Sequence, residues 1–147
     1  MSKLKIKLLA EDVIPPEYAT SGSAGMDLCA HLDEITEIAP GETLRVPTGI
    51  AIALPDANHV ALVCARSGLS VKHGINLANS VGVIDSDYRG EIIVALYNQS
   101  DRTYAIEPGE RIAQLLIMPV TQPEIEICDS LSETDRGSGG FGSTGRI

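Results

Sequence analysis

The sequence predicts an all-β protein, folded as a sandwich or barrel and followed by a flexible glycine-rich C-terminal arm. Its apolar runs are short, β-branched and interrupted by turn residues, which is the pattern of antiparallel sandwiches and barrels. The Pro40-Gly41 and Pro108-Gly109 pairs favour type II turns, because proline presets φ at the second turn position and glycine permits positive φ at the third. Five glycines fall within residues 136–145, so this segment has too little apolar surface to offset its ordering entropy.

Strands are expected wherever apolar residues alternate or cluster between turn signals. They cover residues 4–9, 26–30, 43–46, 50–54, 60–64, 80–84, 91–97, 111–118 and 124–128. Only residues 67–72 are expected to form a helical turn, with Ser67 as its N-cap. The chain is therefore divided into a β domain, residues 1–128, and an arm, residues 129–147.

Composition excludes several classes of function. The formal net charge of −9 argues against non-specific binding to nucleic acid, which requires many phosphates to be neutralised, but not against a small anionic substrate. No apolar run approaches the roughly 20 residues of a membrane span. The first nine residues alternate lysine with apolar residues, unlike a signal peptide. A cytoplasmic location is expected, or a nuclear one in a eukaryote.

The cysteine and histidine positions do not predict a zinc site. Cys29, Cys64 and Cys128 lie far apart without a C-x-x-C motif, and the three histidines lack metal-ligand spacing. The cysteines are expected to be buried as small apolar residues in a reducing compartment.

Two segments in the first half of the chain have polar chemistry at a strand or helix end. The segment AGMDL, residues 24–28, places Asp27 beside a glycine at a strand edge, although a lone Asp there is more often a turn residue. The segment ARSGLS, residues 65–70, combines a guanidinium, a hydroxyl and accessible backbone N–H groups at a possible helix start. That combination indicates an anion-binding site.

Three further segments follow. In GVIDSDYRG, residues 82–90, Asp85 and Asp87 lie between two apolar strands, which predicts a hairpin loop with two carboxylates at its tip. Gln114 interrupts an apolar strand, and its amide needs hydrogen-bond partners if it is buried. The tail RGSGGFGSTG, residues 136–145, lacks the G-K-[ST] ending of a P-loop, yet it contains Arg136 and the only phenylalanine, Phe141. Those two residues favour an arm that orders on a ligand.

These five segments, in this order and spacing, resemble the five motifs of the trimeric dUTPase family. The resemblance spans about residues 4–145 and implies a jelly-roll subunit that forms a homotrimer with shared active sites. It also implies Mg²⁺-dependent hydrolysis of dUTP to dUMP and pyrophosphate, which keeps uracil out of DNA and supplies dUMP for thymidylate synthesis. The nineteen residues 129–147 could span at most roughly 60 Å, enough to lie across a neighbouring subunit.

The resemblance also assigns roles to residues. Tyr88 would lie against the deoxyribose and exclude a 2′-hydroxyl, and Phe141 would stack on the uracil. Asp85 would be the general base, and Asp27 would act indirectly, through magnesium-bound water or by holding polar neighbours. Gln114 would bind the α-phosphate. The uracil edge would be read by Asn79, Gly82, Val83 and Ile84; the phosphates would be held by Arg66, Ser67 and Gly68; the arm would close with Arg136, Gly142, Ser143 and Thr144.

No direct protein ligand for the metal is expected, because Mg²⁺ keeps several waters and takes phosphate oxygens. For Arg66, phosphate binding and bracing of the site both remain open. Two alternatives to the dUTPase function are a dCTP deaminase-type relative and a non-catalytic nucleotide-binding or signalling protein on the same trimeric scaffold.

Overall fold

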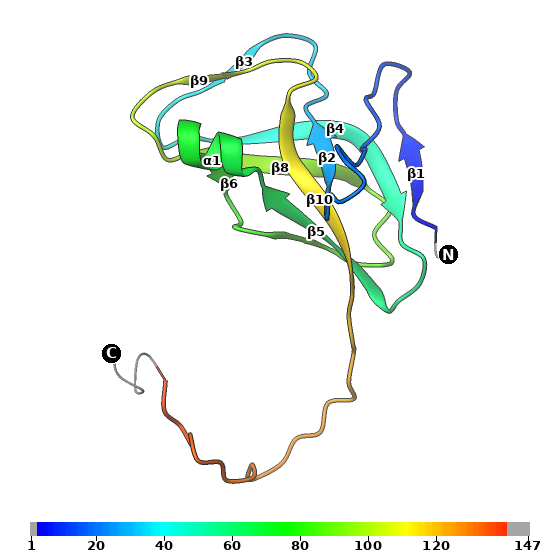
Figure 1. Cartoon of the computed structure of the whole chain (residues 1–147), viewed down its shortest axis with the longest axis vertical. Helices are drawn as coiled ribbons and strands as arrows, with labels where there is room; N and C mark the ends of the chain where they lie inside the picture. The colour runs from blue at the N-terminus through cyan, green and yellow to red at the C-terminus, as the bar shows by residue number, and fades with distance from the viewer. Residues whose placement is uncertain (1–2, 141–147) are drawn as a thin grey trace.

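The computed structural model describes residues 3–140, and within them the predicted all-β architecture is confirmed. Two four-stranded antiparallel sheets pack as a sandwich, joined by a two-stranded ribbon and one short helix (Figure 1). The elements are β1 (Lys5–Leu8), β2 (Met26–Cys29), β3 (Thr36–Ile38), β4 (Thr43–Ala53), β5 (His59–Ala65), α1 (Ser67–His73), β6 (Ile75–Leu77), β7 (Gly82–Ile84), β8 (Glu91–Asn98), β9 (Tyr104–Ile106) and β10 (Arg111–Pro119).

The core lies between the two sheets. One sheet has the strand order β1-β4-β8-β6 and the other β2-β10-β5-β7. Alternation along β8 illustrates why the sequence folds this way: Ile92, Val94 and Leu96 are buried, whereas Ile93 and Tyr97 point outward. The opposing sheet contributes Leu28 and Leu115 to the same apolar cluster.

Strand β4 is one continuous element where two strands were predicted. Its pairing with β8 shifts register between Pro47 and Ala51, and Gly49 adopts a φ of 70°. The buried Thr48 hydroxyl donates to the Ile92 carbonyl at 2.5 Å. The sequence signals at 47–49 therefore mark a bulge inside a strand, not a turn between strands.

The predicted helical turn exists, but its N-cap was predicted wrongly. Arg66, with an extended backbone, occupies the cap position of α1, and Ser67 is the first helical residue. The helix ends at His73 and is followed by Gly74, whose φ of 70° is the left-handed conformation common after a helix. Ser67 thereby presents its side chain and N–H at the exposed helix start.

The expected hairpin over 80–97 is wrong. Strand β7 pairs with β5 in one sheet, whereas β8 pairs with β4 and β6 in the other. The loop that contains Asp85 and Asp87 therefore crosses from one sheet to the other. The pattern of two apolar strands around a turn cannot distinguish these cases, because pairing partners are chosen by distant segments.

The structure also differs from the prediction in three short strands, in residues 124–128 and in the burial of one cysteine. Strands β3, β6 and β9 were not predicted, since three residues are too few to show a periodicity. Residues 124–128 were predicted as a strand but form none within the described chain, and Ile125 and Ile127 are 89% and 96% exposed. Cys29 and Cys64 are half-buried, but Cys128 is exposed, contrary to its expected burial.

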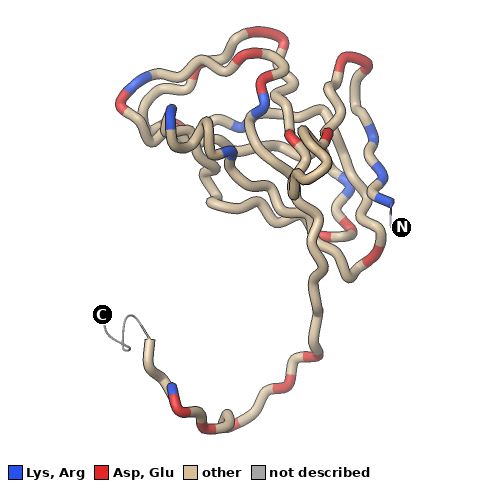
Figure 2. Tube along the Cα trace, viewed as in Figure 1, with Lys and Arg blue, Asp and Glu red and all other residues tan. Residues whose placement is uncertain are grey.

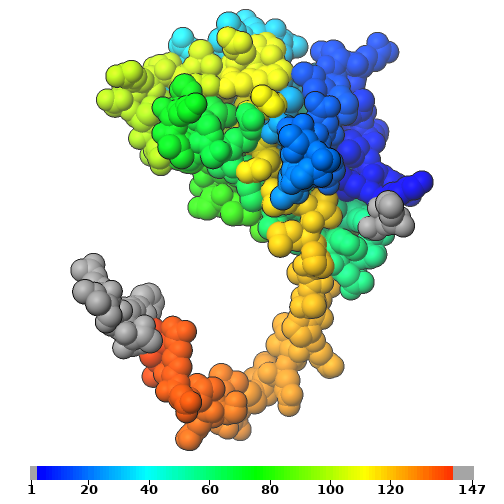
Figure 3. Space-filling model, viewed as in Figure 1, coloured from blue at the N-terminus to red at the C-terminus, as the bar shows by residue number. Residues whose placement is uncertain are grey.

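After β10 the chain leaves the sandwich. Residues 121–138 are exposed, and this segment extends away from the body (Figure 1). Acidic residues are spread along it, whereas lysines gather on β1 (Figure 2). The space-filling view shows the arm without cover from the sandwich (Figure 3). Across residues 3–140, no helix has the length and apolar character needed to cross a membrane.

Asn98 is the buried polar anchor at the end of β8, with 0% exposure. Its Nδ2 donates to the carbonyls of Ile38 and Arg102 at 2.9 and 2.7 Å, and its Oδ1 accepts from the N–H and hydroxyl of Ser100 at 2.9 and 2.7 Å. These bonds tie β8 to β3 and to the loop before β9.

We predict that Asn98→Ala lowers the free energy of unfolding by about 2–4 kcal/mol, because buried carbonyls lose their donor and a cavity forms. Denaturant unfolding at one fixed protein concentration measures this. The exposed neighbour Gln99→Ala is the matched control and should change stability by less than about 0.5 kcal/mol. Equal effects in both variants would contradict the anchor role.

Candidate active site

Strand β10 gathers one set of predicted site residues by pairing with β2 on one side and β5 on the other. Its register places Gln114 opposite both Asp27 and Cys64. Because α1 begins directly after β5, Arg66 and Ser67 reach the same place. Asp27, Gln114, Arg66 and Ser67 line a groove of about 280 Å³ together with Ser23 and Arg111. We call it the phosphate groove, after the role predicted for Arg66, Ser67 and Gln114.

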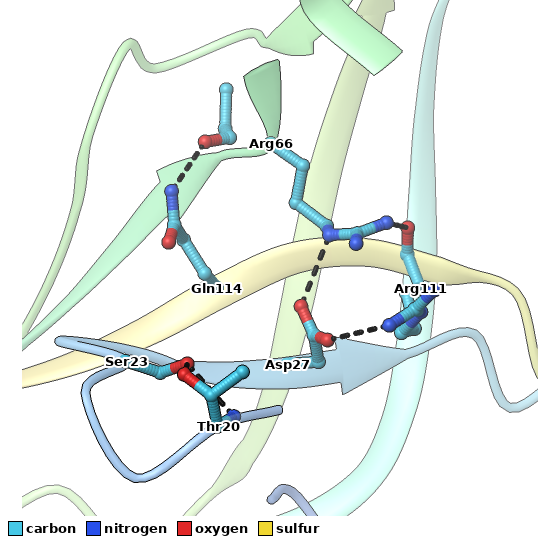
Figure 4. A network of polar contacts seen from close by, with 7 residues as sticks. Thr20, Ser23, Asp27, Arg66, Arg111 and Gln114 are labelled. Carbon is cyan, nitrogen blue, oxygen red and sulfur yellow. Dashed lines mark hydrogen bonds and ion pairs between the residues drawn. The ribbon is translucent and has the colours of Figure 1, made fainter. Parts of the chain in front are cut away.

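Asp27 is held by two arginines at the centre of the phosphate groove (Figure 4). Its Oδ1 lies 3.0 Å from Arg66 Nε, and its Oδ2 accepts from Arg111 Nη1 at 3.1 Å. Arg66 Nη1 also donates to the Arg111 carbonyl at 3.0 Å. The carboxylate is only 14% exposed, so the two guanidinium groups compensate its desolvation and leave one net positive charge.

Arg111 was not predicted as a site residue. The available signal was its position three residues before Gln114 at the start of the same strand, but only the pairing of β10 with β2 brings it to Asp27. Arg66 braces the site through Asp27 and Arg111 while also lining the groove.

Gln114 has the hydrogen-bond partner that its place in an apolar strand requires. Its Nε2 donates to the Ala65 carbonyl at 2.9 Å, which links β10 to the residue before Arg66. Gly25 permits this packing, because a Cβ there would lie 3.2 Å from Gln114 Oε1 and 3.0 Å from Leu116 Cδ1. The amide is therefore oriented at the wall of the groove before any ligand binds.

Cys29 lies two residues after Asp27 on β2, where it is half-buried. Burial, and secondly the Asp27 carboxylate, raise the pKa of its thiol above the ordinary value. The thiol therefore stays protonated near neutral pH and adds no negative charge beside the groove.

A second set of predicted site residues surrounds a pocket of about 360 Å³, the β7 pocket. Its lining includes Asn79, Gly82, Val83, Ile84, Asp85 and Tyr88. Strand β7 pairs only with β5 among the described residues, so its other edge keeps unpaired N–H and C=O groups. Gly82 lies so close to β5 that a Cβ would be 3.1 Å from Val63 Cβ. The volume is within the range of small-ligand sites.

Comparison with known proteins decides the family. A family model described as dUTPase matches residues 11–145. The chain belongs to the dUTPase family. It is 52% identical to a deoxyuridine 5'-triphosphate nucleotidohydrolase of Idiomarina loihiensis, covering 99% of both chains. It is 53% identical to the Desulfitobacterium hafniense protein of the same name, covering 97% of this chain and 96% of that one.

Solved structures agree with this family. The Staphylococcus bacteriophage 80alpha dUTPase with dUpNHpp superimposes with a TM-score of 0.89 at 29% identity, covering 99% of both chains. A mutant dUTPase of phage phi11 of S. aureus, in which a structural Mg(II) ion is coordinated, has a TM-score of 0.79 at 25% identity and covers 89% of this chain and 99% of its own. The resemblance inferred from the five motifs is confirmed.

Within one chain of this dUTPase family member, the two sets of residues lie apart. The phosphate groove and the β7 pocket share no lining residue. Asp27 is on β2 and Asp85 follows β7, which are the two edges of one four-stranded sheet. Three inter-strand spacings of about 4.8 Å separate the edges by roughly 14 Å. A single chain therefore presents the two sets of predicted residues at separate places.

The remaining predicted residues lie at the helix start and in the arm. Gly68 is exposed in the first turn of α1. Arg136 lies in a turn of the arm, where its Nε donates to the Gly139 carbonyl at 2.9 Å. Phe141, Gly142, Ser143 and Thr144 lie outside the described residues, and their predicted roles remain predictions. Over residues 3–140, no three His, Cys, Asp or Glu side chains are grouped to hold a metal ion.

We predict that Arg66→Lys lowers the free energy of unfolding by about 1 kcal/mol although it keeps the charge. A lysine ammonium cannot reproduce the paired bonds of a planar guanidinium to Asp27 and to the Arg111 carbonyl. Thermal or denaturant unfolding measures the change. Arg102→Lys is the control, because that guanidinium is 89% exposed and lies 3.9 Å from Asp101. If both replacements were neutral, Arg66 would not brace the groove.

Proposed function

We propose that this chain hydrolyses dUTP to dUMP and pyrophosphate, with Asp85 as the general base. The observation that carries this proposal is an exposed carboxylate, Asp85, directly after an edge strand whose unpaired peptide groups line a pocket of small-ligand size. Family membership supplies the reaction class, since the relatives named above are deoxyuridine 5'-triphosphate nucleotidohydrolases. The product dUMP serves thymidylate synthesis, and removal of dUTP keeps uracil out of DNA.

The uracil is read by the free edge of β7. Backbone N–H and C=O groups of Gly82, Val83 and Ile84 form a fixed order of donors and acceptors, as an added strand would meet at a sheet edge. Uracil presents an acceptor, a donor and an acceptor along its O2–N3–O4 edge, whereas cytosine presents an acceptor, an acceptor and a donor. A backbone edge ordered for uracil therefore opposes cytosine at two positions. Asn79 borders the same pocket and contributes a further polar group.

The sugar lies against Tyr88, and Phe141 from the arm stacks on the base. Tyr88 lines the β7 pocket with 46% of its surface exposed, so its ring is available as a wall for the sugar. Aromatic rings stack on base planes in offset geometry and exclude water from the site.

Asp85 removes a proton from water as the water oxygen bonds to the α-phosphorus. The bond between that phosphorus and the α–β bridging oxygen breaks in line, and pyrophosphate leaves with the bond's electron pair. The neighbouring carboxylate Asp87 does not line the pocket, which supports Asp85 as the base.

The phosphates are held by the groove and the arm. Arg66, Ser67, Gly68 and Gln114 supply a guanidinium, a hydroxyl, backbone N–H groups and an amide, and the net positive charge around Asp27 suits an anion. Arg111 joins them. From the arm, Arg136 with Gly142, Ser143 and Thr144 closes over the γ-phosphate and stabilises the leaving pyrophosphate.

The side chains of the phosphate groove also indicate how Mg²⁺ would be held. The carboxylate in the groove, Asp27, is already engaged by two arginines, so the groove fits phosphate oxygens better than a bare cation. Mg²⁺ would be held by the substrate phosphates and water, where it neutralises phosphate charge. Asp27 acts indirectly by keeping Arg66 and Arg111 in place.

We further propose that the active unit is a homotrimer whose sites combine the β7 pocket of one copy with the phosphate groove of another. The two sets lie on opposite sheet edges in one chain and share no lining residue, which favours a site that takes them from different copies. Apolar residues without cover in the single chain support assembly: Ile6 and Leu8 on β1, and Ile125 and Ile127 in the arm, are all exposed. The lysines of β1 and the glutamates of 124–128 are complementary in charge (Figure 2).

No observation among the described residues favours a dCTP deaminase-type activity or a purely binding role. The division into a β domain, 1–128, and an arm, 129–147, stays a prediction, as does the cytoplasmic location.

We predict that Asp85→Asn lowers kcat for dUTP by about 10²–10⁴-fold while nucleotide affinity is kept, because the amide preserves shape but cannot take a proton. Pyrophosphate release measures turnover, and calorimetric titration with a non-hydrolysable dUTP analogue measures binding. Asp87→Asn is the matched control and should stay near the unsubstituted rate. Near-normal turnover in Asp85→Asn would rule out the assigned base.

We predict that co-expression of Asp85→Asn and Gln114→Ala chains restores activity that neither variant has alone. In randomly mixed trimers with composite sites, about one quarter of the sites would combine two intact halves. The measurement is pyrophosphate release from purified hybrids, against mixtures of separately assembled variants. If every site were built within one chain, the hybrids would be no more active than the mixture.

A further inference from the structure

Tyr88 is held in place by the backbone that follows it. Its hydroxyl donates to the Glu91 carbonyl at 3.0 Å, so the ring folds back across residue 90. Residue 90 is glycine, and a Cβ there would lie 2.6 Å from Tyr88 Cζ, 3.0 Å from Cε2 and closer still to the hydroxyl oxygen. Any side chain at this position would displace the ring.

Space, and not backbone conformation, is what requires glycine at position 90. Five described glycines have positive φ, namely Gly41, Gly49, Gly74, Gly109 and Gly137, and Gly90 is not one of them. An alanine could therefore adopt the backbone of residue 90. The demand for glycine comes from the ring of Tyr88, which occupies the place of a Cβ.

The Glu91 carbonyl, which accepts the hydrogen bond from the Tyr88 hydroxyl, is itself held in place. Glu91 begins β8, and its Oε1 accepts from the Gly49 N–H at 2.8 Å in the bulge of β4. The adjacent Ile92 carbonyl accepts from the Thr48 hydroxyl in the same bulge. The far end of the ring is thus anchored to the sandwich through two strands.

The near end of the ring is fixed by the crossing loop. Arg89 Nη1 donates to the carbonyls of Ser86 and Tyr88, both at 2.8 Å, and the Tyr88 N–H donates to the Asp85 carbonyl at 3.2 Å. The ring is therefore anchored at its Cα by a closed loop and at its hydroxyl by β8, before any ligand binds.

We infer that Gly90 is a specificity-determining position, where the lack of a side chain and the Glu91 carbonyl lock Tyr88 as a rigid wall against a ribose 2′-hydroxyl. The inference rests on the proposed function, in which Tyr88 lies against the sugar. A wall that could yield by a small rotation would admit one extra hydroxyl. A wall held at both ends resists that rotation, so the discrimination between dUTP and UTP depends on residues 90 and 91 as well as on the ring. Gly90 is a positioning residue and does not touch the substrate.

The test compares kcat and KM for dUTP and UTP in Gly90→Ala and Tyr88→Phe. Both changes free the ring, one by displacing it and one by removing the hydroxyl that donates to Glu91. We expect the ratio of kcat/KM for dUTP to that for UTP to fall by about tenfold or more in Gly90→Ala and by less in Tyr88→Phe, mainly through KM. Tyr97→Phe, an exposed tyrosine on β8 outside the β7 pocket, is the matched control and should keep the ratio.

A double-mutant cycle shows whether Gly90→Ala acts by displacing the Tyr88 ring or by disturbing the loop in general. In a Tyr88→Ala background no ring occupies the place of the Cβ, so adding Gly90→Ala should leave the remaining dUTP/UTP ratio unchanged. The same loss with and without the ring would mean that Gly90 acts through the backbone and would overturn the inference. If Gly90→Ala does not fold, an unchanged ratio in Tyr88→Phe overturns it instead. Failure of the unsubstituted chain to hydrolyse dUTP would contradict the proposed function; hydrolysis with undiminished discrimination in every variant would contradict this inference alone.

Discussion

The ionic contact of Asp27 with Arg66 and Arg111 is the constraint on which the groove between β2, β10 and the start of α1 depends. Removing a carboxylate from water costs free energy unless opposite charges lie beside it. Two planar guanidinium groups offset that desolvation cost for Asp27 and leave one net positive charge. The same contact joins β2, β10 and the start of α1, so it sets where Ser67 and Gln114 lie. Stability of the sheet and attraction for an anion therefore have one source.

The opposite edge of that sheet, strand β7, offers free peptide groups instead of charged side chains. An edge strand with free peptide groups usually invites unwanted pairing, and here the free edge of β7 borders the pocket that we assign to the base. The loop after it crosses between the sheets and is closed by Arg89, while Glu91 anchors it to β4. Specific groups are thus placed on rigid backbone, which avoids the entropy of ordering them on binding.

These two edges cannot meet within one chain, because the strands between them hold them roughly 14 Å apart. A nucleoside triphosphate needs recognition of its base and compensation of its phosphates at one site. The homotrimer that we propose would satisfy this need and would cover apolar residues that the single chain leaves exposed, such as Ile125 and Ile127. If the proposed site is shared between copies, catalysis requires the assembled oligomer.

Local chemistry in the sequence determined the fold class, most strands, the turn residues, the five motifs and hence the family, and it correctly required a partner for Gln114. Those features depend on residues close together in the chain. The tertiary structure alone decided that residues 80–97 cross between sheets, that 124–128 pair with nothing in the described chain, that Arg66 caps α1, and that Arg111 reaches Asp27. The roles of the site residues stay predictions. Strand pairing joins segments far apart in the sequence, and the energy of each pairing depends on every other, so no local pattern could have specified it.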